Sequence, residues 1–258
     1  MADWNSELYL KFEQERTRPA RDLADRIRMV PAKTVLDVGC GPGNSTAVLK
    51  ETFPGADILG VDNSAAMLGK ARSAHPDLRF AFCDAARIRE CAGGRFDVIF
   101  SNACIQWLPD HRPLLRNMFD CLNPGGVLAV QIPMNGGAPL FRIIREEIAR
   151  FRELDTVRCE PNETLEPDGY YRILAELTDC FELWECSYYH RMGSHRMLVE
   201  WVKGTRLRPY LNVLNDRSAK ELEERILERA GQVYPVQPDG CILFRFRRFF
   251  FTAKRLGD

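Results

Sequence analysis

The sequence predicts an α/β protein with a doubly wound, mostly parallel sheet that is covered by helices on both faces. Over the first half of the chain, short apolar runs of strand length alternate with segments whose apolar residues recur at helical spacing. Gly, Pro, Asn and Ser occupy the short joints between these segments. The 258 residues are 45% hydrophobic and 28% charged, which is enough for one large domain with a buried core.

The first predicted strand is Thr34–Val38, and it runs directly into a glycine-rich loop, Gly39-Cys-Gly-Pro-Gly43. The helix expected over 44–53 has Asn44 or Ser45 as its N-cap, because both side chains can accept from backbone N–H groups. Punctuation by Pro, Gly, Asn and Ser then bounds a strand at 56–61, a helix at 64–74 with a serine cap, and strands at 78–83 and 96–101.

The turn Asn123-Pro-Gly-Gly126 separates a helix from the fifth strand. The second half of the chain is less regular, and its polar segment 152–167 is expected to lack regular structure. The remaining expected elements are helices at 112–122, 140–151, 170–177, 195–203 and 220–230 and strands at 127–132, 180–189 and 241–253. The resulting architecture is an α/β core with a helical insertion over 194–239, before the last strand.

Charge and cysteine content exclude several classes of protein. The 36 Lys and Arg residues balance 36 Asp and Glu residues, which argues against a nucleic-acid or polybasic membrane partner. The sequence starts without the basic and apolar pattern of a secretory signal, so we expect a cytoplasmic protein. None of the nine cysteines forms a C-x-x-C pair, which favours free thiols and no metal site.

The glycine loop indicates a cofactor site at the carboxyl end of the first strand. Its spacing is G-x-G-x-G, whereas the dinucleotide fingerprint is G-x-G-x-x-G. Asp37 precedes the loop within the strand, where a carboxylate would repel a pyrophosphate but attract an ammonium group. These features favour a cofactor with a charged amino-acid end and no phosphate, such as S-adenosylmethionine.

Two more carboxylates follow the next two predicted strands. Asp62 is placed to accept hydrogen bonds from two ribose hydroxyls, and Asp84, with the Ala85 N–H, is placed to meet the adenine. Each carboxylate alone also fits a helix cap or a surface residue. Three of them at the ends of successive strands, together with the glycine loop, predict an adenosyl site.

These segments resemble the motifs of the class I S-adenosylmethionine-dependent methyltransferases. The matching stretches are Asp37-Val-Gly-Cys-Gly-Pro-Gly-Asn-Ser-Thr46, Gly60-Val-Asp-Asn-Ser64, Cys83-Asp-Ala85, Phe96-Asp-Val-Ile-Phe-Ser-Asn102 and Leu122-Asn-Pro-Gly-Gly-Val127. Other stretches resemble the trans-aconitate 2-methyltransferase family along nearly the whole chain: Asp3-Trp-Asn5, Tyr9-Leu-Lys-Phe12, Glu15-Arg-Thr-Arg-Pro19, Gln106-Trp-Leu-Pro-Asp-His111, Val130-Gln-Ile-Pro133, Trp201-Val-Lys-Gly204 and Leu207-Arg-Pro209.

The resemblance implies a Rossmann-like, seven-stranded sheet whose last strand is antiparallel. It implies one methyltransferase domain over 1–258, with an N-terminal helical cap over 1–30, a cofactor-binding core over 31–135 and a substrate cap formed by the insertion over 194–239. The cofactor-binding residues would be Asp37, Gly39, Gly41, Asn44, Asp62, Asn63, Met67, Asp84, Ala85 and Asn102.

The implied reaction is methyl transfer to a carboxylate of a small polycarboxylic acid, which gives a monomethyl ester. A carboxylate of pKa about 4 is already ionised, so the reaction needs no general base and no catalytic side chain is expected. Arginine is the residue suited to holding the remaining carboxylates. We expect substrate contacts from Tyr9, Arg16, Arg18, Trp107, Tyr189, Arg206 and Arg208.

Three alternatives remain open at this point. After Val130-Gln-Ile-Pro133 the family has an Asp-Asn pair, whereas this chain has Met134-Asn-Gly-Gly137, so another small acid or a hydroxylated metabolite is a rival substrate. A nicotinamide-dependent oxidoreductase is a remote rival, because the third fingerprint glycine is missing. A non-catalytic cofactor-binding protein is the third. We expect a monomer, with Trp107 as either a pocket wall or a core residue and His111 as a helix N-terminal residue rather than a base.

Overall fold

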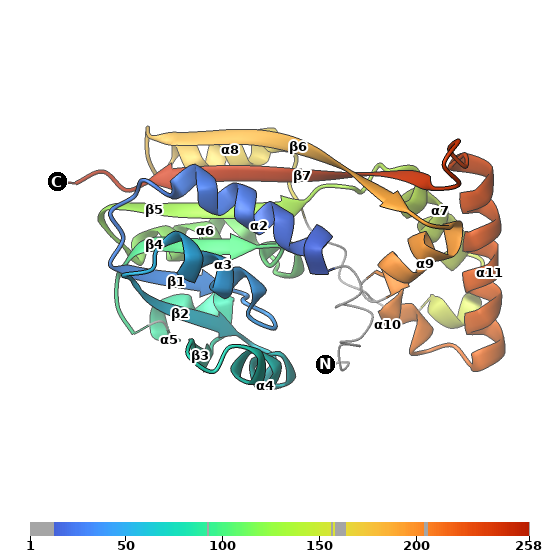
Figure 1. The fold of residues 1–258 in the computed structure, drawn as a ribbon, viewed down its shortest axis with the longest axis horizontal. Helices are drawn as coiled ribbons and strands as arrows, with labels where there is room; N and C mark the ends of the chain where they lie inside the picture. The colour runs from blue at the N-terminus through green and yellow to red at the C-terminus, as the bar shows by residue number, and fades with distance from the viewer. Residues whose placement is uncertain (1–12, 92, 156, 158–163, 204–205, 258) are drawn as a thin grey trace. The chain divides into compact units, whose positions relative to one another are not determined.

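The computed structural model describes residues 13–91, 93–155, 157, 164–203 and 206–257 (Figure 1). The chain divides into two compact units. The sheet unit comprises Gln14–Pro133, Asn162–Cys186 and Arg248–Asp258. The helical unit comprises the described residues within 134–161 and 187–247. Strands β6 (Phe181–Met192) and β7 (Ile242–Lys254) contribute residues to both units.

The strands form a seven-stranded sheet in the order β3-β2-β1-β4-β5-β7-β6. The first five strands pair in parallel, and β7 pairs antiparallel with β5, which confirms the predicted mixed sheet. The order reverses at β1, so the loop after β1 lies where doubly wound folds bind their ligands. The parallel strands are β1 (Thr34–Val38), β2 (Asp57–Asp62), β3 (Arg79–Phe82), β4 (Phe96–Asn102) and β5 (Leu122–Pro133).

Different helices cover the two faces of the sheet unit (Figure 1). On one face, Trp184 of β6 stacks on Phe250 at 5.2 Å, and Arg26 of α2 (Glu13–Ile27) lies over the same indole. On the other face, the buried Tyr170 of α8 (Pro167–Ala175) stacks on Phe251. Since neighbouring strand residues point to opposite faces, the FRFRRFFF run of β7 supplies aromatic rings to both layers.

The other helices of the sheet unit connect successive strands. These are α3 (Asn44–Thr52), α4 (Ala65–Ala74), α5 (Ile88–Cys91) and α6 (His111–Asp120), with short 3-10 turns at Ala85–Arg87 and Ile105–Trp107. Ser64 caps α4 as predicted and accepts from Met67 N–H at 3.3 Å. The predicted cap of α3 is wrong: the N-cap is Gly43, in the left-handed region at φ +95°, and Asn44 already belongs to the helix.

The helical unit has its own core, built on α7 (Pro139–Ile148), α9 (His195–Lys203), α10 (Arg208–Leu211) and α11 (Asp216–Val233). Helices α9 to α11 form the predicted insertion before the last strand; α10 was not expected, and α11 begins four residues earlier than expected. The segment 152–167 contains a short turn, Arg152–Leu154. In the described part of the chain, no helix is long and apolar enough to cross a membrane.

A buried carboxylate joins α7 to α11 in the helical unit. Glu147 is 1% exposed and accepts from Arg225 at 2.9 Å and from Arg229 at 2.7 Å. Burial acts to raise the pKa of Glu147, but the hydrogen bonds from both arginines outweigh it and hold the pKa below its usual range. This ion-pair group fixes the packing of the two helices and is not part of the predicted site.

Candidate functional site

The glycine loop after β1 turns sharply and is held against the end of β2. Gly39 and Gly41 have backbone φ angles of +74° and +55°, which residues with a side chain rarely adopt. The N–H groups of Gly39 and Cys40 donate to Val61 O at 2.8 and 3.0 Å. A Cβ at Gly39 would overlap the side chain of Cys104, whose pKa burial raises to about 12. The loop backbone therefore packs on that thiol, which stays protonated.

Asp37 lies beneath this loop and is fully buried. Its Oδ2 accepts from Ser45 Oγ at 2.7 Å and from Thr46 Oγ at 2.6 Å, while its Oδ1 has no hydrogen-bond partner. Burial raises the pKa of Asp37 to about 6, although the two hydroxyls act to lower it. The carboxylate thus ties the first turn of α3 to β1 and carries negative potential that its two neutral partners do not cancel.

Asp62 connects the glycine loop to the end of β2. Its Oδ2 accepts from Gly41 N–H at 3.0 Å, and its Oδ1 accepts from Ser64 N–H at 2.8 Å. Each carboxylate oxygen has two lone pairs, so each keeps one for a further donor. The side chain is half-buried, and this burial raises its pKa. Asp62 is therefore oriented by backbone groups and can still accept two hydroxyls.

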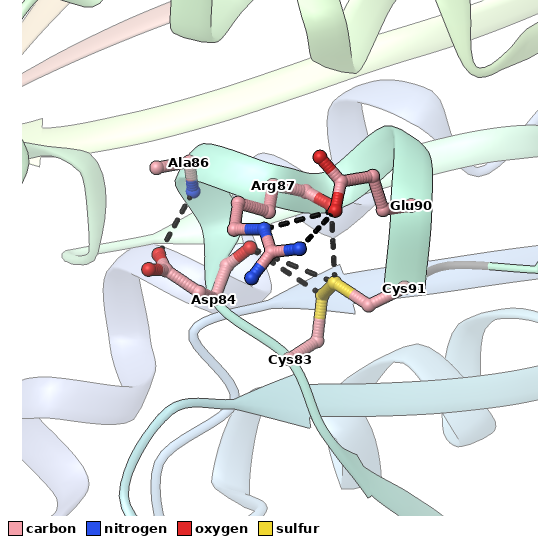
Figure 2. The surroundings of a disulfide bond; sticks show 6 residues. All are labelled: Cys83, Asp84, Ala86, Arg87, Glu90 and Cys91. Atoms are coloured by element: carbon pink, nitrogen blue, oxygen red, sulfur yellow. Dashed lines mark hydrogen bonds and ion pairs between the residues drawn. A yellow bond between two sulfur atoms is a disulfide. The ribbon is translucent and has the colours of Figure 1, made fainter.

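Asp84 follows β3 and lies in the loop that the Cys83–Cys91 disulfide closes (Figure 2). Its Oδ1 accepts from Ala86 N–H at 3.0 Å. The preceding residue, Cys83, donates its N–H to Asp62 O at 3.1 Å, which brings the ends of β2 and β3 together. Cys83 is also bonded to Cys91, with 5.7 Å between their Cα atoms. The prediction of free thiols is therefore wrong for Cys83 and Cys91. The two cysteines are eight positions apart in the sequence, so they lack the C-x-x-C spacing for which the sequence was searched.

Reducing the Cys83–Cys91 bond is expected to destabilise the protein. Closing a loop of this length lowers the entropy of the unfolded chain and stabilises the fold by about 2–3 kcal/mol. Cys91→Ser, or treatment with dithiothreitol, should therefore lower the Tm by about 5–10 °C in thermal unfolding followed by circular dichroism. The control is Cys180→Ser, because Cys180 is exposed and free. Equal melting of the reduced and oxidised proteins would contradict this prediction.

The remaining predicted cofactor residues lie along the same edge of the sheet unit. Ala85 is buried in the turn after Asp84, Asn44 begins α3, and Asn102 ends β4. Asn63 is exposed at the end of β2, and Met67 is buried in α4. The structure thus brings the predicted cofactor residues to the ends of four consecutive strands, β1 to β4.

The segment after β4 carries Trp107, whose side chain is 43% exposed, so the core alternative for this residue is wrong. His111 holds the segment in place. Its Nε2 lies 2.8 Å from Ile105 O and its Nδ1 lies 2.8 Å from the hydroxyl of Tyr170. With Nε2 donating to the carbonyl, Nδ1 accepts from Tyr170. A ring buried and bonded at both nitrogens acts as a brace for this segment, in line with its assignment as a helix N-terminal residue.

The other predicted substrate residues fall in separate parts of the chain. Tyr9 lies outside the described residues, Arg16 lies in α2, and Arg18 is exposed on that helix. In the helical unit, Tyr189 is exposed on β6, and the guanidinium of Arg206 lies 5.8 Å from the Phe141 ring. Arg208 begins α10, and its buried Nη1 has no hydrogen-bond partner.

The altered edge Met134–Gly137 belongs to the helical unit. Asn135 donates from Nδ2 to Arg247 O at 2.8 Å and accepts from Arg247 N–H at 2.7 Å. The side-chain amide of Asn135 therefore pairs with the backbone of β7 as a neighbouring strand would. Its oxygen and its nitrogen are both used in these two hydrogen bonds. This pairing gives Asn135 a structural role, which the sequence alone did not suggest.

The predicted cofactor residues fit S-adenosylmethionine on chemical grounds. The loop presents glycine backbone, Asp62 keeps acceptor capacity for a diol, and Asp37 supplies negative potential that suits an ammonium. No group of three or more His, Cys, Asp or Glu side chains suited to a metal ion occurs within the part of the chain that the structure describes.

Comparison with known proteins agrees with this assignment. The family described as "Methyltransferase domain" matches residues 35–126. The fold is similar to the YcgJ protein of Bacillus subtilis, at 14% identity, 93% coverage of this chain, 100% of that chain and a TM-score of 0.63. It is also similar to phosphoethanolamine N-methyltransferase 2 of Haemonchus contortus, solved with S-adenosylhomocysteine, at 18% identity, 93% and 53% coverage and a TM-score of 0.58.

The curated relatives are much closer in sequence. Trans-aconitate 2-methyltransferase of Enterobacter sp. is 42% identical over 99% of this chain and 99% of its own length. The enzyme of the same name from Afipia carboxidovorans is 42% identical over 99% of this chain and 100% of its own length. These matches confirm the predicted methyltransferase fold and the S-adenosylmethionine cofactor, and they overturn the oxidoreductase alternative. At this identity over nearly its full length, the chain belongs to the trans-aconitate 2-methyltransferase family.

Proposed function

We propose that this enzyme transfers the methyl group of S-adenosylmethionine to one carboxylate of trans-aconitate and releases the monomethyl ester and S-adenosylhomocysteine. The observation that carries the proposal is the Asp62 carboxylate, oriented by Gly41 and Ser64 N–H groups beside a glycine loop, in a chain 42% identical to trans-aconitate 2-methyltransferases. The second candidate is methylation of another small acid, which the altered Met134–Gly137 segment favours.

The cofactor supplies an electrophilic methyl group on a sulfonium. In our proposal, Asp62 accepts the two ribose hydroxyls, and Asp84 and the Ala85 N–H meet the adenine. The Gly39–Gly41 backbone lies against the amino-acid end, whose ammonium is attracted by Asp37. Asn44, Asn63, Met67 and Asn102 complete the contacts. Asp37 acts through its field rather than by contact, because it is fully buried.

The substrate carboxylate is the nucleophile, so the protein's task is to position it and to neutralise the other carboxylates. We assign the neutralising role to the arginines: Arg16 and Arg18 in the N-terminal helical cap over 1–30, and Arg206 and Arg208 in the substrate cap over 194–239. Tyr9, Trp107 and Tyr189 would contribute the remaining contacts. The cofactor-binding core over 31–135 needs no general base for this reaction.

The pH dependence of cofactor binding tests the role of Asp37. Burial raises the pKa of Asp37 to about 6, so the carboxylate is ionised above that pH and neutral below it. An ammonium is attracted only by the ionised form. The affinity for S-adenosylmethionine should therefore fall about tenfold as the pH is lowered from 7.5 to 5, as measured by calorimetry. Asp37→Asn should flatten this profile, and a profile that is unchanged in the variant would contradict the assignment.

The paired change Arg206→Gln/Arg208→Gln tests the substrate cap. Loss of two charged donors is expected to raise the KM for the acid at least ~30-fold, with the Kd of S-adenosylmethionine unchanged. Initial rates and calorimetry measure the two quantities separately. Arg217→Gln is the control, since Arg217 is exposed at the second position of α11 in the same insertion. If the double variant changes only thermal stability, the two arginines are structural.

The experiment that tests the function is initial-rate methyl transfer from labelled S-adenosylmethionine to trans-aconitate, cis-aconitate, citrate and isocitrate. We expect a clear preference for trans-aconitate. Transfer to none of the four, with cofactor binding intact, would reject this substrate and keep the methyltransferase class.

We further propose a cytoplasmic monomer that binds neither nucleic acid nor membrane. Analytical ultracentrifugation tests the monomer.

A further inference from the structure

Two buried polar side chains and a half-buried one lie side by side on adjacent strands of the sheet unit. Asn102 of β4 pairs with Gln131 of β5, and Gln131 pairs with Phe250 of β7. Arg248 is two residues before Phe250 and opposite Pro133, so its side chain lies on the same face as Gln131. This is the face that also carries Trp184. The row lies at the carboxyl edge of the parallel strands, and its first member, Asn102, is a predicted cofactor residue.

The orientation of the Gln131 amide is fixed by its neighbour. Arg248 Nη1 donates to Gln131 Oε1 at 3.5 Å, so the oxygen of the amide, and not its nitrogen, faces Nη1. Gln131 is fully buried, and its Nε2 has no hydrogen-bond partner. An unsatisfied buried donor costs about 1–3 kcal/mol, and such groups usually serve a ligand or a bound water.

The chemistry of the pair selects the ligand. Arg248 is 5% exposed, and its guanidinium is a planar cation with five N–H donors. The Gln131 Nε2 adds a further donor beside it. Two adjacent donor groups, one of them cationic, match the two oxygens of a carboxylate. Asn102, beside Gln131 on the neighbouring strand, is half-buried at the strand end.

We propose that Gln131 and Arg248 form a carboxylate-binding subsite of this enzyme. The inference rests on the proposed function for its two possible ligands, which share one chemistry. The carboxylate belongs either to the acid substrate or to the amino-acid end of S-adenosylmethionine. In either case the pair holds the ligand and takes no part in bond making, so the residues are binding rather than catalytic.

The test uses Gln131→Glu, which keeps the shape of the side chain and places a carboxylate against Arg248. This internal carboxylate competes with the ligand for the guanidinium, and because its charge is opposite to that of Arg248 the variant should retain its Tm. Calorimetry on the full-length protein measures S-adenosylmethionine binding and, in the presence of S-adenosylhomocysteine, trans-aconitate binding. We expect one of the two affinities to fall at least ~10-fold, and the affinity that falls identifies the source of the carboxylate.

Arg248→Lys serves as the second variant, since it keeps the charge but loses the planar fork and should weaken the same ligand. Arg245→Gln is the matched control, because Arg245 is exposed on the same strand and pairs with Ser187. Unchanged affinity for both ligands in a folded Gln131→Glu protein would overturn the subsite. This test is independent of the proposed function because it measures binding and not methyl transfer. Even if the unchanged protein methylated none of the acids, its affinity for S-adenosylmethionine could still be compared with that of Gln131→Glu.

Discussion

An Asp62→Ala enzyme is expected to bind S-adenosylmethionine at least ~100-fold more weakly than the unchanged protein. The substitution removes a charged acceptor for two ribose hydroxyls, each such bond contributing about 1.5–3 kcal/mol. It also leaves the N–H groups of Gly41 and Ser64 without the oxygens to which they donate at 3.0 and 2.8 Å. Because Gly41 lies in the cofactor loop, the loop loses one of its attachments to β2 and keeps those from Gly39 and Cys40 N–H to Val61 O. Titration calorimetry measures the loss directly.

The control for this prediction is Asp57→Ala at the other end of β2. Asp57 is exposed and forms its ion pair with Arg79, a kind of surface contact that contributes little to stability. Its loss should leave cofactor affinity unchanged. Asp62→Asn should fall between the two, since one oxygen remains to accept hydrogen bonds. Normal affinity together with a lowered Tm would show that Asp62 only shapes the loop, and normal affinity would in either case contradict its role in cofactor binding.

The sequence predicts the strand ends well because each of them is marked by a physical signal. Asp37, Asp62 and Asp84 are charged residues in or directly after apolar runs, and parallel strands bring such positions to one edge of the sheet. Ser64 was identifiable as a cap because a serine precedes a helical pattern. The cap of α3 was missed, since Gly43 starts that helix by its backbone conformation and not by a side-chain acceptor.

Long-range partners could not be predicted from local patterns. The Cys83–Cys91 bond depends on how a turn and a short helix fold back, and the stacking of Gly39 on Cys104 joins loops 65 positions apart. A signal for the carboxylate subsite does exist. Arg245 and Arg247 alternate with aromatic residues, but Arg248 breaks this alternation and must share a face with Phe246 and Phe250. Gln131 is likewise a polar residue in an otherwise apolar run.

Replacing Gly39 with alanine is expected to destabilise the enzyme by about 2–5 kcal/mol. The residue has φ +74°, where a side chain costs about 1–2 kcal/mol. Its new Cβ would also overlap both Sγ and Cβ of Cys104, and overpacking of this kind costs about 1–3 kcal/mol more. Because the loop cannot keep its path, cofactor binding should fall together with stability. Urea unfolding measures the free energy of unfolding, and calorimetry measures the affinity.

A second variant and a double variant separate the two causes. Gly41 also has a positive φ, +55°, but a Cβ there would meet nothing within 4 Å, so Gly41→Ala should cost only the conformational part, about 1–2 kcal/mol. In Gly39→Ala/Cys104→Gly, the overlapping side chain is gone, and about half of the lost stability should return. If removal of Cys104 restores nothing, the whole cost is conformational and the close packing of the loop on this thiol is not what requires glycine at position 39.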